Sequence, residues 1–246
     1  MPRAKVALVT GANRGLGREA ARLLGALGVT VWMGARDEGR GQEAAAQLRG
    51  EGADIHHVPL DVTDGATIAD AAARIDAEHG RLDILLNNAG IVGAAGRRAP
   101  STVPVDDLRT VYETNVFGVV AVTDAMLPLL RRAPAARVVN VSTNLGSLTT
   151  AAGPDGPAAR SQMTLLGYAS SKAALNMTTL LFARELAGTG ITVNAVNPGY
   201  CATAMNDFQG FLSPAEGAAV VVRAAMLPDD DTTTGAFFNS AGREAW

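Results

Sequence analysis

Cysteine and histidine are scarce in this chain of 246 residues, which limits its chemistry. Its one cysteine, Cys201, excludes a disulfide within the chain, so we expect a reducing compartment and a cytoplasmic protein. Cys201 itself is expected to be a small apolar filler rather than a nucleophile. The three histidines are not spaced with cysteines or carboxylates as metal ligands are, so no metal site is predicted.

The chain also lacks long runs of one charge and long apolar runs. Its formal net charge is −3, and no basic patch predicts a nucleic acid or an acidic membrane surface as a partner. The apolar segment 116–130 is interrupted by Gly118, Thr123, Asp124 and Pro128, so no membrane-spanning helix is predicted. The short apolar run at 6–9 is typical of a first strand rather than of a signal peptide.

What is present is a steady alternation of strand and helix patterns over residues 1–246, which predicts a single α/β domain. Strands are expected at 5–10, 29–34, 55–60, 82–86, 137–141, 191–196 and 236–238. Helices are expected at 15–27, 40–50, from a cap at 63 or 64 to about 79, and at 106–130, 168–186 and 214–226. Right-handed crossovers between such strands give a doubly wound, mainly parallel seven-stranded sheet of the Rossmann type, with helices on both faces.

Ligands of such sheets bind beyond the carboxyl ends of the strands, where two long loops also lie. The segment 144–167 and the loop 199–215 both interrupt the alternation, and loops of this length often cover binding sites. The second loop carries Phe208 and Phe211, which we expect to cover a substrate pocket together with Tyr200.

A glycine-rich turn follows the first strand and opens the first helix. Gly11, Gly15 and Gly17 occur in the sequence Thr-Gly-Ala-Asn-Arg-Gly-Leu-Gly. Glycine lets the backbone approach a phosphate closely, and a helix N-terminus presents unpaired N–H groups and partial positive charge. The strand–loop–helix context therefore predicts a nucleotide phosphate site, whereas an isolated match would be an ordinary turn.

Tyr168 and Lys172 are four residues apart, and so share one face of the predicted helix. The pKa of a tyrosine is about 10, and a neighbouring ammonium group stabilises the phenolate. We therefore expect Lys172 to lower the pKa of Tyr168 and to make it a general acid. In isolation, such a pair is more often a surface contact of a helix.

The order of these motifs resembles the short-chain dehydrogenase/reductase family. The resemblance covers nearly the whole chain and includes Thr10–Gly17, Asp61, Asn87–Gly90, Asn115, the end of the 138–143 segment, Tyr168 with Lys172, and Pro198-Gly199 with Thr203. The segments 35–37, 40–42 and 237–238, and the insertion before Tyr168, resemble the carbonyl reductase branch. The family implies a nicotinamide dinucleotide and hydride transfer.

The resemblance implies a set of cofactor-binding residues. They are Gly11, Asn13, Arg14, Gly15, Leu16, Gly17, Arg36, Asp61, Val62, Asn88, Ala89, Gly90, Tyr168, Lys172, Pro198, Gly199 and Thr203. Asp61 corresponds to the adenine contact, Lys172 would also reach the nicotinamide ribose, and the 198–203 loop would lie against the nicotinamide. Asn87 is expected to brace strands rather than to touch the cofactor.

The residues after the second strand bear on the choice between NAD and NADP. An acidic residue there binds the 2′-hydroxyl of the ribose, whereas an arginine pairs with a 2′-phosphate. The family's acidic position corresponds to Ala35, followed by Arg36, and Arg14 adds a second cation. Two cations near one phosphate favour NADP(H) over NAD(H).

The remaining catalytic residues also come from the resemblance. A hydroxyl that holds the carbonyl oxygen follows the fifth strand, and alignment on Gly146 assigns it to Thr143, with Ser142 as the alternative. Asn115 corresponds to the helix asparagine that holds a water against the lysine. Thr143 replaces the serine usual in the family; it keeps the hydroxyl but adds a methyl group.

The sequence thus predicts NADPH-dependent reduction of small apolar or aromatic aldehydes and ketones. Tyr168 would act as the acid, Lys172 would adjust it and Thr143 would hold the carbonyl oxygen. The alternatives are an NAD(P)-dependent alcohol dehydrogenase working in the oxidative direction and a catalytically idle nucleotide sensor on the same fold. Because the insertion 144–167 would cover the surface that other members use for pairing, we expect a monomer, with a dimer or tetramer as the alternative.

Overall fold

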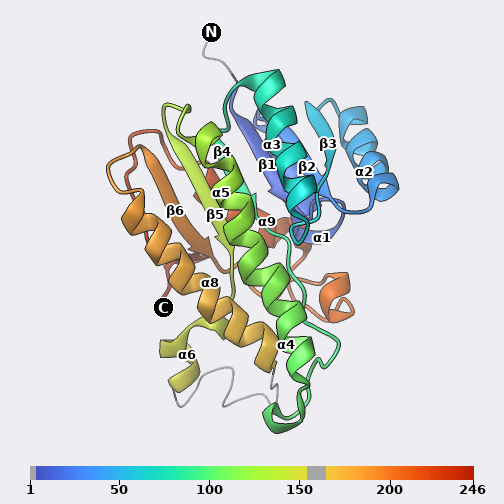
Figure 1. The fold of residues 1–246 in the computed structure, drawn as a ribbon, viewed down its shortest axis with the longest axis vertical. Helices are drawn as coiled ribbons and strands as arrows, with labels where there is room; N and C mark the ends of the chain where they lie inside the picture. The colour runs from blue at the N-terminus through green and yellow to red at the C-terminus, as the bar shows by residue number, and fades with distance from the viewer. Residues whose placement is uncertain (1–3, 154–164) are drawn as a thin grey trace.

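Eight strands form a single sheet in the computed structural model, which describes residues 4–153 and 165–246 (Figure 1). The strand order is β3-β2-β1-β4-β5-β6-β7-β8. The strands are β1 (Val6–Thr10), β2 (Thr30–Ala35), β3 (Ile55–Pro59), β4 (Ile84–Asn87), β5 (Ala136–Val141), β6 (Ile191–Val196), β7 (Phe237–Asn239) and β8 (Gly242–Arg243).

The first seven strands pair in parallel, which confirms the predicted doubly wound sheet. The order in which strands are added to the sheet reverses between β1 and β4, and Leu8 of β1 pairs with Trp32 on one side and Leu85 on the other. The unpredicted strand β8 has two residues and pairs antiparallel with β7. Two residues are too few to give an alternating pattern in the sequence.

Helices cover both faces of the sheet (Figure 1). They are α1 (Gly15–Ala26), α2 (Glu38–Gly50), α3 (Gly65–His79), α4 (Val105–Tyr112), α5 (Gly118–Leu130), α6 (Leu148–Ala152), α8 (Leu166–Glu185) and α9 (Pro214–Ala225). Short 3₁₀ turns lie at η1 (Pro100–Thr102), η3 (Asn144–Gly146) and η4 (Ala204–Asn206). Helices α1, α2 and α9 pack on one face and α3, α5 and α8 on the other, so the sheet lies between two apolar cores.

The helix predicted at 106–130 is one continuous helical run with a π-helical turn inside it, η2 (Glu113–Phe117). Asn115 lies in this turn, and π-helical turns of this kind often occur at functional sites. The run 105–130 is long and apolar enough to cross a membrane, with a mean hydropathy of 1.3. It is also 56% buried, and it packs against α3 and the sheet as a core helix does.

The two predicted long loops are partly ordered into short helices. The inserted segment begins with η3 and α6, whereas Met163 and the rest of 154–164 lie outside the described residues. The prediction that this insertion covers a pairing surface is therefore not addressed by the structure. On the described part of α8 and its neighbour η2, Phe117, Met177 and Leu181 are all more than half exposed.

The loop after β6 differs from the prediction in the direction of its aromatic side chains. Phe208 and Phe211 are 69% and 81% exposed, so both side chains project into solvent. Asp207 and Phe208 both have positive φ angles, and the Phe208 N–H donates to the Thr203 carbonyl. Tyr200 contacts Phe211 edge-on, at 5.9 Å between ring centroids.

Candidate active site

The glycine turn after β1 is packed closely against the segment that follows β4. Gly11 and Gly15 have positive φ angles, of 63° and 55°, which suit glycine. A Cβ at Gly17 would lie 2.4 Å from Asn88 Nδ2 and 2.6 Å from the Gly11 carbonyl oxygen, so a side chain is excluded there. The N-terminus of α1 therefore opens onto a cradle of bare backbone, as a bound phosphate requires.

Asparagine side chains hold this cradle in place. Asn88 Nδ2 donates to the carbonyls of Thr10 (2.8 Å) and Gly11 (3.2 Å), and its backbone N–H donates to Thr10 Oγ1. Asn87 instead donates to Thr123 Oγ1 and Asn140 Oδ1, so it braces β4 against α5 and β5, as expected. Asn88 shapes the phosphate turn, and Asn87 belongs to the interior of the sheet.

The segments that carry the predicted cofactor residues approach one another at several points. A Cβ at Gly11 would lie 3.0 Å from Ala89 Cα, and one at Gly15 would lie 3.5 Å from Thr203 Cγ2. The loop after β6 therefore reaches the glycine turn at the start of the chain. Nearby, Leu16 packs on the core and Pro198 is buried.

Lys172 is buried in the same region and donates from Nζ to the Val141 carbonyl at 2.6 Å. A Cβ at Gly90 would lie 3.6 Å from Lys172 Nζ and 3.4 Å from Asn115 Oδ1, so both polar groups converge beside Gly90. The Nζ atom is also 5.8 Å from the centre of the Tyr168 ring. The end of β4, the π turn and α8 thus place an ammonium group beside a phenol.

Asn115 positions the helix that carries Tyr168. Its Oδ1 accepts from the Ile91 N–H, and its Nδ2 donates to the Ile91 carbonyl (both 2.9 Å) and to Ser171 Oγ (3.0 Å). Ser171 in turn donates to the Tyr168 carbonyl at 2.7 Å. Both amide hydrogens of Asn115 are therefore engaged, so its side chain acts mainly as a brace, and only Oδ1 has capacity left to accept from a water.

The two hydroxyls after β5 have different surroundings. Ser142 is 2% exposed, and its Oγ donates to Asn176 Oδ1 at 2.6 Å, inside the packing of α8. Thr143 is half-buried, and its Oγ1 makes only two 3.3 Å contacts, with Asn144 Oδ1 and the Leu145 N–H. The Ser142 hydroxyl is thus engaged in the core, whereas the Thr143 hydroxyl is held loosely at the end of the strand.

A close approach fixes this strand end to the catalytic helix. A Cβ at Gly146 would lie 2.7 Å from the Lys172 carbonyl carbon and 2.8 Å from Lys172 Cβ. The turn η3 therefore sits directly on α8 at Lys172, and only glycine permits it. This contact sets the distance between the Thr143 turn and the face of α8 that carries Tyr168.

Burial governs the ionisation of both catalytic groups. Burial raises the pKa of Tyr168 from 10.0 to about 12 and lowers the pKa of Lys172 from 10.5 to about 8. In the protein alone, desolvation therefore raises the pKa of Tyr168, which is opposite to the lowering by Lys172 that the sequence predicted. At neutral pH the phenol keeps its proton and the lysine is mainly charged.

A basic hollow of about 210 Å³ lies beside the glycine cradle, between α1 and α2. It is lined by Asn13, Arg14, Arg18, Arg40, Glu43, Ala44 and Gln47. Three arginines and one acidic residue line it, so the hollow suits an anion such as a phosphate, which would compete with the ion pairs of Arg18 with Glu19 (3.1 Å) and of Arg40 with Asp37 (3.4 Å). Arg36 is exposed at the end of β2 and does not line the hollow, whereas Arg40, from the first turn of α2, does.

The two predicted adenine-side residues lie after β3. Asp61 Oδ1 accepts from the N–H and the hydroxyl of Thr63, at 2.9 and 2.8 Å, so one carboxylate oxygen is engaged in the local turn. Val62 is buried against α5, where a Cβ at Gly118 would lie 2.7 Å from the Val62 carbonyl oxygen.

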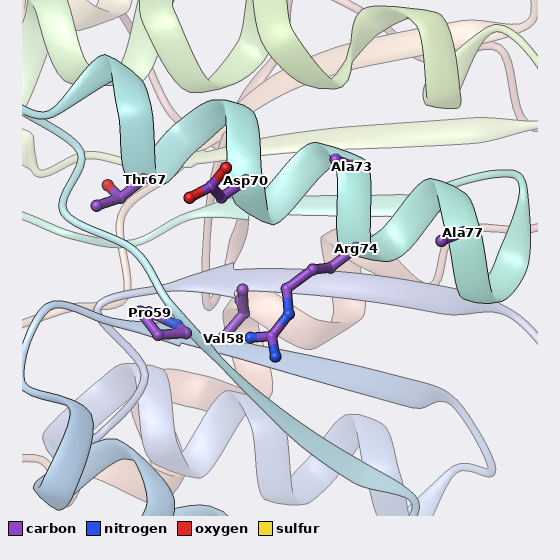
Figure 2. A pocket seen from close by; sticks show the side chains of 7 residues that line it. All are labelled: Val58, Pro59, Thr67, Asp70, Ala73, Arg74 and Ala77. Carbon is purple, nitrogen blue, oxygen red and sulfur yellow. The ribbon is translucent and has the colours of Figure 1, made fainter.

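A second hollow, of about 410 Å³, lies between β3 and α3 (Figure 2). Arg74 extends from α3 over Val58, with Asp70 one turn earlier on the same helix (Figure 2). No predicted site residue lines this hollow. Arg74 therefore offers a matched control for the arginines of the basic hollow.

Sequence reasoning missed several residues of this site. Ser171, Asn176, Arg18 and Arg40 all contact predicted residues or line the same hollow. Arg40 could have been predicted from its position, because a basic residue in the first helical turn after β2 can reach the same phosphate as Arg36. The other three follow only from packing between segments that are distant in the sequence.

Known proteins share both the sequence pattern and the fold. The family described as short chain dehydrogenase matches residues 5–210. Short-chain dehydrogenase/reductase 1 of Saponaria officinalis is 35% identical over 91% of this chain and 90% of its own length. The (+)-neomenthol dehydrogenase of Arabidopsis thaliana is 32% identical over 96% of each chain.

The fold is also similar to that of a solved structure. The NADPH-bound carbonyl reductase from chicken fatty liver superimposes with a TM-score of 0.85, at 31% identity, over 99% of this chain and 100% of its own. The glycine cradle fits the pyrophosphate of such a dinucleotide, because its bare backbone meets the N-terminus of α1. The chain therefore belongs to the short-chain dehydrogenase/reductase family, whose members are oxidoreductases that use NAD(P)(H).

Proposed function

We propose that the protein reduces small apolar or aromatic aldehydes and ketones to alcohols, with NADPH as the hydride donor. The observation that carries this proposal is the placement of the Tyr168 phenol beside the buried Lys172, whose Nζ lies 5.8 Å from the ring centre and donates to the Val141 carbonyl. Reduction of a carbonyl requires a proton donor at neutral pH, and Tyr168 supplies one. Among relatives, the carbonyl reductase and the (+)-neomenthol dehydrogenase bear names that agree with carbonyl–alcohol chemistry.

The residues divide the reaction between them. Bound NADPH supplies a hydride to the carbonyl carbon. The carbonyl oxygen, held by the Thr143 hydroxyl, gains the electron pair of the broken double bond and takes the proton of Tyr168. Lys172 Nζ, 5.8 Å from the ring centre, stabilises the phenolate that remains. Asn115 and Ser171 hold α8 so that these groups stay aligned.

The preference for NADPH over NADH rests on the basic hollow. Arg14, Arg18 and Arg40 line it beside the start of α1, with Glu43 as the acidic residue of its lining. A 2′-phosphate adds a doubly charged acceptor that guanidinium groups bind well, whereas the 2′-hydroxyl of NAD has no such attraction. Arg36, exposed just after β2, is the further cation that we propose for the same phosphate.

Two alternatives predict different behaviour. An alcohol dehydrogenase working in the oxidative direction would use the same residues with Tyr168 as the base, and the basic hollow and the name of the carbonyl reductase agree better with reduction by NADPH. A catalytically idle nucleotide sensor needs no buried lysine beside a phenol, and burial of Lys172 costs stability. Reduction is therefore the function we favour.

A panel of aldehydes and ketones, followed by loss of NADPH absorbance, tests the proposal. We expect turnover with apolar and aromatic carbonyl compounds and a higher kcat/KM with NADPH than with NADH. Turnover only with alcohols and the oxidised cofactor would favour the dehydrogenase. Binding of NADPH with no turnover on any member of the panel, or on the corresponding alcohols, would favour the sensor.

A further inference from the structure

The segment 242–246 packs against the turn at residues 197–199, which follows β6. Strand β8 pairs with β7, and the Glu244 N–H donates to the Phe237 carbonyl at 2.7 Å. The Trp246 ring stacks on Phe237, with centroids 5.3 Å apart and planes 18° apart. The Trp246 carbonyl accepts from the Thr149 N–H (3.0 Å) in α6, so the segment lies between the sheet and α6 (Figure 1).

Glu244 from this segment fixes the orientation of a buried amide. Asn197 is 8% exposed, and its Nδ2 donates to Glu244 Oε2 at 2.9 Å. The other end of the amide, Oδ1, accepts from the Gly199 N–H at 3.0 Å. Because a carboxylate can only accept hydrogen bonds, it holds the NH₂ end of the amide and leaves the oxygen facing Gly199. If the amide rotated, two donors would face each other at Gly199 and its N–H would lose its partner.

The turn held in this way begins the loop at the predicted nicotinamide end. Gly199 has a φ angle of 84°, and a Cβ there would lie 2.6 Å from Leu212 Cδ1, so the turn permits little variation. Four residues further on, Thr203 reaches the glycine turn beside Gly15. The backbone of Asn197 is fixed as well, since its N–H donates to the Phe238 carbonyl at 2.7 Å.

We propose that Glu244 is a positioning residue for the nicotinamide half of the cofactor, acting through the Asn197 amide on the Pro198-Gly199 turn. The proposal rests on the placement of that turn against the nicotinamide, which belongs to the proposed function. Neither Glu244 nor Asn197 lines the basic hollow that we assign to the 2′-phosphate. Loss of Glu244 should therefore affect one end of the dinucleotide and not the other.

The affinities for two ligands, one with the nicotinamide ring and one without it, report on the two ends of the dinucleotide separately. We expect Glu244→Ala to weaken NADPH binding about tenfold, as the loss of a hydrogen bond to a charged group implies. Binding of 2′-phospho-ADP-ribose, which lacks the ring, should change less than about twofold. The same comparison with NADH and ADP-ribose covers the case in which NAD is the natural cofactor.

Glu244→Gln is the conservative variant, because its amide oxygen can still accept from Asn197, and it should restore most of the affinity. Arg243→Ala removes a neighbouring exposed side chain of the same segment and should change neither ligand. Asn197→Ala should weaken NADPH as much as Glu244→Ala does, and the double variant should lose no more than either single one. Such non-additive losses of affinity would show that Glu244 and Asn197 act on the cofactor through the same contact.

Three results would overturn the proposal: unchanged NADPH affinity in Glu244→Ala, equal loss of both ligands, or additive losses in the double variant. Equal loss would mean that Glu244 only stabilises the fold. Because these measurements need no carbonyl substrate, they stay decisive if the proposed reduction fails. Failure of the reduction would appear in the substrate panel and leave the ligand comparison untouched.

Discussion

The adjacent hydroxyls Ser142 and Thr143 give two substitutions with opposite expected effects. Ser142→Ala removes the donor that satisfies the buried Asn176 Oδ1, which is 2.6 Å away. Leaving a buried acceptor unpaired costs about 1–3 kcal/mol of unfolding free energy. For a chain of this length each kcal/mol lowers Tm by about 2–4 °C, so we expect a fall of about 2–12 °C. The kcat/KM of the folded variant should stay close to that of the wild type.

Thr143→Val keeps the shape of the side chain and removes only the hydroxyl. The contacts of Thr143 Oγ1 are long, at 3.3 Å, so the expected change in Tm is less than about 2 °C. The loss of one preorganised donor to the developing oxyanion should lower kcat by about 10²–10³-fold. Thr143→Ser retains the hydroxyl and should keep most of the activity.

Thermal unfolding and steady-state reduction of one carbonyl substrate, measured on the same preparations, test this pair. The reasoning is refuted if Ser142→Ala abolishes turnover without a change in Tm while Thr143→Val stays active. That result would assign the substrate hydroxyl to Ser142 and would mean that the Asn176 contact contributes little to stability.

Three further predictions concern Lys172, the basic hollow and the oligomeric state. Burial lowers the pKa of Lys172 from 10.5 to about 8, so the unfolded chain binds more protons between these values and the stability of the wild type should rise over that window. Lys172→Met removes this group and should be inactive. Between pH 7 and 10.5, the unfolding free energy from denaturant titrations should rise about 3 kcal/mol more for the wild type than for Lys172→Met. Parallel curves of unfolding free energy against pH would contradict the burial of the charge. Arg36→Ala and Arg40→Ala should each weaken NADPH binding about tenfold and NADH binding little, while Arg74→Ala in the other hollow changes neither; equal effects on both cofactors would reverse the assignment. Light scattering should show a monomer, and a stable dimer or tetramer would end that prediction.

The sequence predicted the features that follow from local spacing. The glycine turn, the strand–helix alternation and the i, i+4 pair of Tyr168 and Lys172 each lie within a few residues, where backbone geometry decides the outcome. The choice of Thr143 over Ser142 came from alignment on Gly146 and stays a prediction, with which the core contact of Ser142 agrees.

What the sequence did not predict depends on burial and on contacts between distant segments. Charge counting suggested a lower tyrosine pKa, but desolvation, which only the folded structure reveals, acts in the opposite direction. The contact between Asn197 and Glu244 joins residues 47 positions apart. Asp207 and Phe208 are two consecutive left-handed residues that are not glycine, a conformation that the sequence did not indicate.

The most direct test of the account is Tyr168→Phe, which removes the proposed proton donor and keeps the ring. NADPH binding should stay within about threefold of the wild type, since the ring and Lys172 remain. Carbonyl reduction should fall by about 10²–10⁴-fold, the usual contribution of a positioned general acid. Wild-type turnover in this variant, with NADPH bound normally, would contradict the central claim that Tyr168 donates the proton.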